Sequence, residues 1–206
     1  MTKNLISPEH DSALKHVTGK ATYTDDILEP KNLLHAAIGY SKISSGKIIK
    51  IDFTEVLNSK GVIDIITDKD IEGNNEVGPV FKGDPIFTSK KIEYHGQPIF
   101  AVAATSYKLA KIAASKVKIK FKETKPILSI KEALKKKSFV HDPQYLKKGN
   151  AIKVIKKSKY SLRGELYSGG QDHFYLEGQI AMTIPQEDNN FLIYSSTQHP
   201  SETQQI

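Results

Sequence analysis

Short apolar segments rich in β-branched residues recur through the first 120 residues and are separated by turn residues, which constrains the chain to sheets of short strands. Such segments, bounded by glycine, proline, asparagine and serine, predict strands rather than helices. The predicted strands cover residues 33–40, 47–53, 62–67, 91–94 and 98–104. We expect the last two to form a pair joined by residues 95–97, and residues 68–85 to form a long loop.

One longer amphipathic helix is predicted between Ser106 and Ser115, because its apolar residues recur at helical spacing and its lysines fall on the opposite face. Residues 117–121 then alternate strictly between apolar residues and lysine, which is typical of a strand. A strand–helix–strand unit follows from this order. Thr54 is expected to cap a short second helix that ends near Gly61. The fold class predicted is α+β.

Changes in composition suggest how the chain is divided. Residues 1–15 are a polar N-terminal arm, residues 16–126 a first domain, residues 127–150 a linker with a short helix at 130–134, and residues 151–206 the beginning of a second domain. In that second part, residues 160–167 predict a strand. Residues 180–185 and 191–195 predict a hairpin.

The composition excludes several functions. The chain of 206 residues carries a formal charge of +7, but only Arg163 among its 30 basic residues is arginine, so specific nucleic-acid binding is not expected. Cysteine is absent, which excludes a disulfide, a cysteine nucleophile and an all-cysteine iron–sulfur cluster within these residues. We find no signal peptide and no apolar run of membrane-spanning length, so a cytoplasmic protein with no membrane partner is expected.

Residues 169–179 are the segment that differs most from an ordinary globular sequence. Two glycines, Gly169 and Gly170, free the backbone to turn or to approach a bulky group, and Gln171 follows them directly. A tight loop and a binding site both fit this pattern. Asp172 and Glu177 could act as an acid–base pair, but a bond from Glu177 to backbone or to a neighbouring side chain is favoured.

The aromatic and imidazole side chains nearby are interpreted as structural. Phe174 and Tyr175 are expected in the core rather than against a substrate. His95, His173 and His199 lack the short spacing of paired metal ligands, so metal ligation by side chains is not expected.

Several motifs in a fixed order resemble one family. Residues 16–27, 76–79, 95–102, 169–179 and 195–202 resemble successive signatures of xanthine dehydrogenase, a molybdenum hydroxylase related to aldehyde oxidase. The similarity is to the N-terminal portion of the molybdopterin-binding large subunit of the bacterial type, over about residues 9–206. The resemblance implies an aldehyde oxidase/xanthine dehydrogenase α/β hammerhead domain followed by the first strands of the molybdopterin-binding domain.

The resemblance also implies which residues bind the cofactor. Gln171 corresponds to the residue that approaches the oxo group of the molybdenum, with Gly169 and Gly170 allowing close approach; Gln198 is a weaker candidate near the same region. The molybdenum would be held by the sulfurs of the pterin rather than by a protein ligand. Iron–sulfur clusters and FAD would lie on a partner chain, and NAD would be the electron acceptor.

The activity implied is oxidative hydroxylation of hypoxanthine and xanthine to urate. No catalytic residue falls in this portion, because the family's general base and substrate-orienting residues come later, so the isolated chain is expected to be inactive. A relative that oxidises aldehydes or another heterocycle, and a truncated, non-catalytic fragment or interaction module, are the alternatives. Uncovered sheet edges and apolar faces predict poor solubility.

Overall fold

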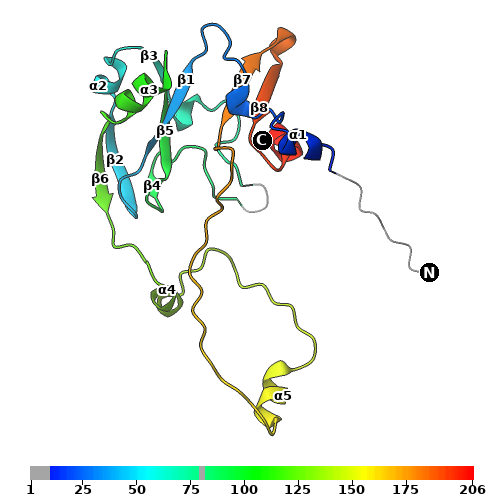
Figure 1. The fold of residues 1–206 in the computed structure, drawn as a ribbon. Helices are drawn as coiled ribbons and strands as arrows, with labels where there is room; N and C mark the ends of the chain where they lie inside the picture. Colours follow the sequence, from blue (N-terminus) through cyan, green and yellow to red (C-terminus); the bar gives the residue numbers. More distant parts are fainter. Residues whose placement is uncertain (1–9, 79–81) are drawn as a thin grey trace, which may run out of the picture. The chain divides into compact units, whose positions relative to one another are not determined.

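The computed structural model describes residues 10–78 and 82–206, which fall into two compact units (Figure 1). The first unit comprises the chain up to residue 124 together with residues 175–206, and the second comprises residues 125–174. Most of the predicted N-terminal arm, and Pro79 in the motif at 76–79, lie outside the described residues. The described part of the arm leads into helix α1 (Ala13–Val17) and the short helix η1 (Thr24–Asp26).

Six strands of the first unit form two three-stranded antiparallel sheets (Figure 1). The strand orders are β1-β5-β3 and β4-β2-β6, so β1 and β6 are both outer strands. The strands are β1 (His35–Tyr40), β2 (Gly46–Asp52), β3 (Val62–Ile66), β4 (Lys91–Ile92), β5 (Pro98–Ala104) and β6 (Lys118–Glu123). All the strands predicted before residue 125 are therefore confirmed.

Two of the predicted strand arrangements are wrong. β4 and β5 do not pair, and the strands on either side of the long helix, β5 and β6, lie in different sheets. The reason is that β5 pairs with β1 on one side and with β3 on the other, so neither β4 nor β6 can join it. The turn between β4 and β5 has other partners. Its backbone bonds to Ser41, which accepts from the Gly96 N–H at 3.0 Å and donates its own N–H to the Gln97 carbonyl at 2.9 Å. The buried Gln97 side chain also accepts from the Glu93 N–H at 2.9 Å.

The predicted helix is confirmed as α3 (Tyr107–Ala114), which packs on β1 and β5. The Ser106 hydroxyl accepts from the Leu109 N–H and so caps the helix, while Ala110 and Ala113 are fully buried. The short helix is confirmed as α2 (Thr54–Leu57), but Thr54 is its first residue and not its cap. The Asp52 carboxylate accepts the Thr54 N–H instead, at 2.9 Å.

The core lies under β5 and is built around Phe100 and Val102, which are both fully buried. The Phe53 ring meets the Phe100 ring edge-on with centroids 5.0 Å apart. Burying a side chain of this size contributes about 1.5–3 kcal/mol, so Phe100 and Val102 stabilise the first unit. Gly39 faces Phe100 across the β1–β5 pair, where the ring leaves no space for a larger residue.

The second unit has little regular structure. The helix expected near 130–134 is confirmed as α4 (Ile130–Lys136), and α5 (Ala151–Lys157) was not predicted. The strand predicted at 160–167 is wrong, because these residues have no pairing partner. Every residue from 134 to 176 is exposed. A strand needs a neighbour for its backbone groups, and none is available here.

The hairpin predicted near the end of the chain is confirmed. Strands β7 (Ala181–Pro185) and β8 (Phe191–Ser195) pair antiparallel around the short helix η3 (Glu187–Asn189). Helix α6 (Pro200–Gln205) follows, and the remaining short helix of the described chain is η2 (Asp68–Asp70). Within residues 10–78 and 82–206, we find no helix with the length and apolar character needed to cross a membrane.

Candidate functional site

The glycine pair and Gln171 lie in an open, extended stretch of the second unit. Neither Gly169 nor Gly170 has a positive φ, and a Cβ at either position would have no atom within 4 Å. The backbone therefore does not turn sharply at the glycines. Gln171 is exposed, and its carboxamide forms no hydrogen bond with any described residue. Gln171, for which the resemblance implies a contact with the cofactor, therefore has an amide donor without a partner among the described residues.

Glu177 bonds to backbone, as the sequence favoured. Its Oε1 accepts a hydrogen bond from the Thr24 N–H at 2.6 Å, and both residues are partly buried. Thr24 is the first residue of η1, where unpaired N–H groups favour a carboxylate. Glu177 therefore has a structural partner within the first unit and does not form an acid–base pair with Asp172, which is exposed.

The aromatic residues of the same run are not in the core. Phe174 and Tyr175 are both exposed, so the expectation that they would be buried is wrong. The neighbouring chain is irregular and exposed up to residue 176, and it provides no apolar surface to cover them.

A surface cleft of about 1020 Å³ in the first unit brings together two of the motifs. One side is formed by the loop that contains Glu76 and Gly78, and the other by Gln198 and the residues of α6. Gln198 therefore lines a cavity, whereas Gln171 does not line this one. The sequence could not predict that Glu76 and Gln198 line the same cleft, because they are distant in the chain and neither belongs to a predicted strand pair.

Glu76 holds its loop in shape. Its Oε1 accepts from the N–H groups of Gly78 and Asp84, both at 2.9 Å, and its Oε2 accepts from the Gly83 N–H at 2.7 Å. These bonds, first those from Gly83 and Gly78, hold the pKa of the Glu76 carboxyl below its ordinary value. Sequence reasoning missed this role, although a glutamate among several glycines is a signal for such a loop.

A second set of hydrogen bonds holds the same loop, next to those of Glu76. The Asn75 side chain donates to the Phe87 carbonyl at 2.8 Å and accepts from the Phe87 N–H at 3.0 Å. Because Phe87 is buried, this pair of bonds fastens the loop to the body of the first unit.

The histidines are distributed without forming a metal site. In the part of the chain that the structure describes, no group of three or more histidine, aspartate or glutamate side chains is arranged to hold a metal ion. His199 lies at the start of α6, where its N–H donates to the Thr197 hydroxyl at 3.0 Å.

Two family models match successive parts of the chain. Residues 18–125 match the model described as "Aldehyde oxidase and xanthine dehydrogenase, a/b hammerhead domain", and residues 133–206 match the model of the molybdopterin cofactor-binding domain. The chain thus combines a hammerhead domain with a region of the molybdopterin cofactor-binding domain type. The chain belongs to the aldehyde oxidase and xanthine dehydrogenase family of molybdenum hydroxylases.

Individual relatives agree with this assignment. The chain is 37% identical over 200 residues to xanthine dehydrogenase of Drosophila pseudoobscura pseudoobscura, covering 96% of this chain and 15% of the relative. It is 38% identical over 197 residues to aldehyde oxidase 2 of Macaca fascicularis, covering 95% and 14%. Among solved structures, the aldehyde oxidoreductase of Desulfovibrio gigas superposes with a TM-score of 0.76 and 28% identity, over 91% of this chain and 23% of that one. The chain thus spans about 15% of the length of these curated relatives.

Proposed function

We propose that this chain forms the N-terminal part of the molybdopterin-binding portion of a xanthine dehydrogenase. The bound cofactor would supply oxidative hydroxylation of hypoxanthine and xanthine, with electrons passing to iron–sulfur clusters and FAD on other domains or a partner chain and then to NAD. The observation that carries the proposal is the match of residues 133–206 to a molybdopterin cofactor-binding domain. Relatives named as xanthine dehydrogenases support the purine substrate.

The chemistry of the residues at 169–171 supports the proposal of a bound molybdopterin. The Gln171 carboxamide is exposed and has no partner within the described residues, so its N–H groups remain available to a ligand oxygen. The space around Gly169 and Gly170 is open, which lets a bulky group lie against their backbone. We assign Gln171 as the donor to the oxo group, Gly169 and Gly170 as its backbone support, and Gln198 as a weaker contributor.

The chemical role of Gln171 follows from the properties of a carboxamide. An amide donates a hydrogen bond without titrating, so its contribution does not depend on pH near neutrality. A fixed donor aimed where negative charge develops lowers the energy of the transition state. No general base is assigned among the residues of this chain. The domain limits proposed from the sequence, a hammerhead domain at 16–126, a linker at 127–150 and the cofactor domain from 151, are retained as part of the proposal.

The experiment is to produce the complete gene product that contains this chain in a host that makes molybdopterin. Molybdenum content, pterin content and NAD reduction with hypoxanthine, xanthine and aldehydes are then measured. We expect bound molybdenum and pterin, and purine oxidation. Gln171→Ala should lower the rate by about 10²-fold, in the range found for loss of one such donor. Gln179→Ala, an exposed change in the same run, is the matched control and should have little effect.

The possible results separate the alternatives. If the gene product oxidises aldehydes but not purines, the alternative of an aldehyde-oxidising enzyme is correct. Absence of both molybdenum and pterin from the purified gene product contradicts the proposal and favours the non-catalytic module.

A further inference from the structure

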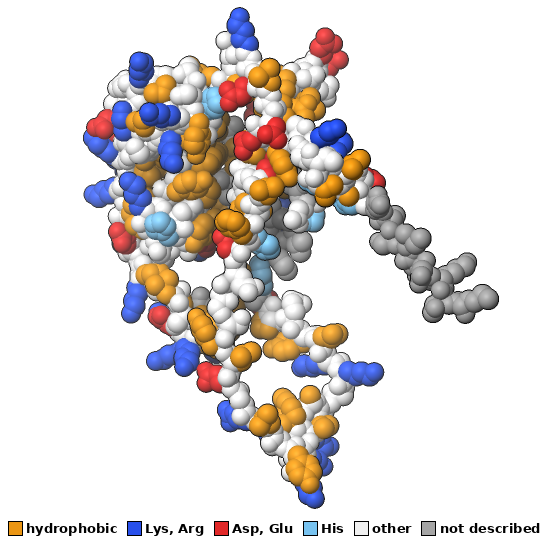
Figure 2. Space-filling model, viewed as in Figure 1, with side chains coloured by type: hydrophobic (Ala, Val, Ile, Leu, Met, Phe, Trp, Pro, Cys, Tyr) orange, Lys and Arg blue, Asp and Glu red, His pale blue; other side chains and the backbone are white. Residues whose placement is uncertain are grey.

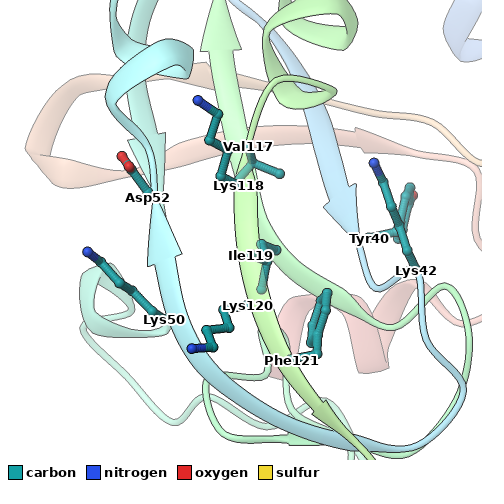
Figure 3. Close-up of a pocket in the computed structure, with 9 residues that line it drawn as sticks. All are labelled: Tyr40, Lys42, Lys50, Asp52, Val117, Lys118, Ile119, Lys120 and Phe121. Carbon is teal, nitrogen blue, oxygen red and sulfur yellow. The ribbon is translucent and has the colours of Figure 1, made fainter.

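The outer strands of the two sheets border a second cleft of the first unit, distinct from the one beside Glu76. This cleft of about 490 Å³ runs along β6 and reaches the end of β1. Figure 3 shows Val117, Ile119 and Phe121 on the side of β6 that faces Tyr40. The cleft is lined by Tyr40, Lys42, Lys50, Asp52 and residues 117–121.

The outer edge of β6 offers unpaired backbone groups. β6 pairs with β2 on one side only. Apart from that pairing, we find no backbone–backbone hydrogen bond to Lys118–Glu123 from any described residue. An edge with free N–H and C=O groups can accept another strand.

The side chains along this edge alternate in chemistry. Ile119 and Phe121 are half-buried and pack against the core, whereas Lys118 and Lys120 are exposed. A strand added beside β6 places its successive side chains alternately next to the apolar pair and next to the lysines.

The lysines of β2 and β6 outnumber the carboxylates around this cleft, which leaves an excess of positive charge there. Lys50 lies opposite Lys120 and Lys47 lies opposite Lys122 in the β2–β6 register, and like charges in opposite positions destabilise a sheet. Lys118 is paired with Glu55, but Lys42, Lys50 and Lys120 form no ion pair with a described residue. Asp52 is the one carboxylate that lines the cleft within the described chain.

We propose that the edge of β6 binds an extended segment of a protein partner in which acidic residues alternate with aliphatic ones. The acidic residues lie beside Lys120 and Lys122, which are exposed and have no ion pair with a described residue, and the aliphatic ones extend the apolar surface of Ile119 and Phe121. A second copy of this strand fits poorly, because every register that keeps its apolar side chains beside Ile119 and Phe121 places lysine against lysine. This inference does not depend on the proposed molybdenum chemistry.

The test uses the full 206-residue chain and synthetic peptides of six residues, the length of β6. One fluorescent peptide alternates glutamate with valine, and a second has the same composition in two blocks. A third is the alternating peptide with N-methyl groups on alternate backbone nitrogens, which removes strand pairing but keeps charge. Binding is followed by fluorescence anisotropy, and hydrogen exchange locates the amides protected by the peptide.

We expect the alternating peptide to bind, to protect amides of 118–123, and to lose binding on N-methylation. Lys120→Glu should weaken binding by about fivefold, because it replaces an attractive cross-strand pair with a repulsive one. The matched control is Lys111→Glu on α3, an exposed lysine away from the cleft, which should change binding by less than about twofold.

Three results overturn the proposal. Equal binding of the alternating and block peptides shows attraction by charge alone. Unchanged binding after N-methylation of the peptide excludes strand addition. This measurement uses the unaltered protein, so it remains decisive even if the Lys120→Glu variant fails to fold. If a thymidine oligonucleotide displaces the fluorescent peptide as well as the unlabelled alternating peptide does, the surface binds anions in general and has no preference for a polypeptide.

Discussion

The carboxylate of Glu177 accepts a hydrogen bond from the backbone N–H of Thr24 at 2.6 Å, across a sequence separation of 153 residues. This bond ties the end of the run that follows Gln171 to the segment that begins the hammerhead domain. Both segments were singled out from the sequence, but nothing in the sequence indicated that they meet.

Removing this carboxylate should loosen the attachment of η1. Glu177→Ala leaves the partly buried Thr24 N–H without its partner, and we expect a loss of about 1 kcal/mol in the free energy of unfolding. Urea unfolding followed by circular dichroism measures the loss, and hydrogen exchange at Thr24 reports it locally. Glu177→Gln keeps an acceptor oxygen and should lose less. Glu165→Ala, an exposed glutamate with no hydrogen bond to a described residue, is the control; an equal loss in that variant contradicts the assignment.

The loop closed by Glu76 should open in acid. Because hydrogen bonds hold the folded pKa of Glu76 below the ordinary value of 4.5, its ionised form stabilises the loop fully above about pH 4.5. That stabilisation is lost as the pH falls through the folded pKa. Hydrogen exchange at Gly83 and Asp84 should therefore accelerate in acid beyond its intrinsic pH dependence.

Glu76→Gln should produce the open loop at neutral pH, since an amide has one acceptor oxygen where the carboxylate uses two. Glu72→Gln, an exposed change in the same loop, serves as the control. If Gly83 and Asp84 remain equally protected in Glu76→Gln, the carboxylate does not hold the loop.

Position 39 should not tolerate a side chain. A Cβ at Gly39 would lie 2.1 Å from ring atoms of Phe100, which is fully buried and cannot move without disturbing the core. Gly39→Ala should lower the free energy of unfolding by about 1–3 kcal/mol, as overpacking does elsewhere. Gly73→Ala is the matched control, because nothing lies within 4 Å of its Cβ, and its change should stay within about 0.5 kcal/mol. Comparable denaturation midpoints for the two variants would mean that the Phe100 ring moves aside at no cost in stability.

Trypsin should cut the second unit first. Residues 125–174 contain twelve lysines and arginines against four acidic residues, and Figure 2 shows exposed lysine and hydrophobic side chains along α4 and α5. Protease needs an extended, accessible chain, which the exposed residues from 134 onwards provide. Mass spectrometry of early digests should find cleavage after lysines of this unit before any in β2 or β6. Early cleavage at the exposed lysines of β6 instead would show that the sheet is the less stable part.

Local pattern was sufficient for most individual elements. Strict alternation at residues 117–121 identified β6, and helical spacing between Ser106 and Ser115 identified α3, because each element buries one face against a common core. The same rule failed at residues 160–167, where the pattern suggests a strand but no neighbouring strand pairs with it. The sequence also predicted that Glu177 bonds to backbone or to a neighbouring side chain, but it did not predict that the partner is Thr24.

Sequence alone determined the family, the α+β class and the residues that carry the resemblance, since these depend on residue types and their order along the chain. Tertiary structure decided which strands share a sheet, that Glu76 and Gln198 line one cleft, and that Thr24 is the partner of Glu177. The physical reason is that backbone hydrogen bonds and carboxylates are satisfied by whichever groups the fold brings within about 3 Å, and separation along the chain does not constrain that choice.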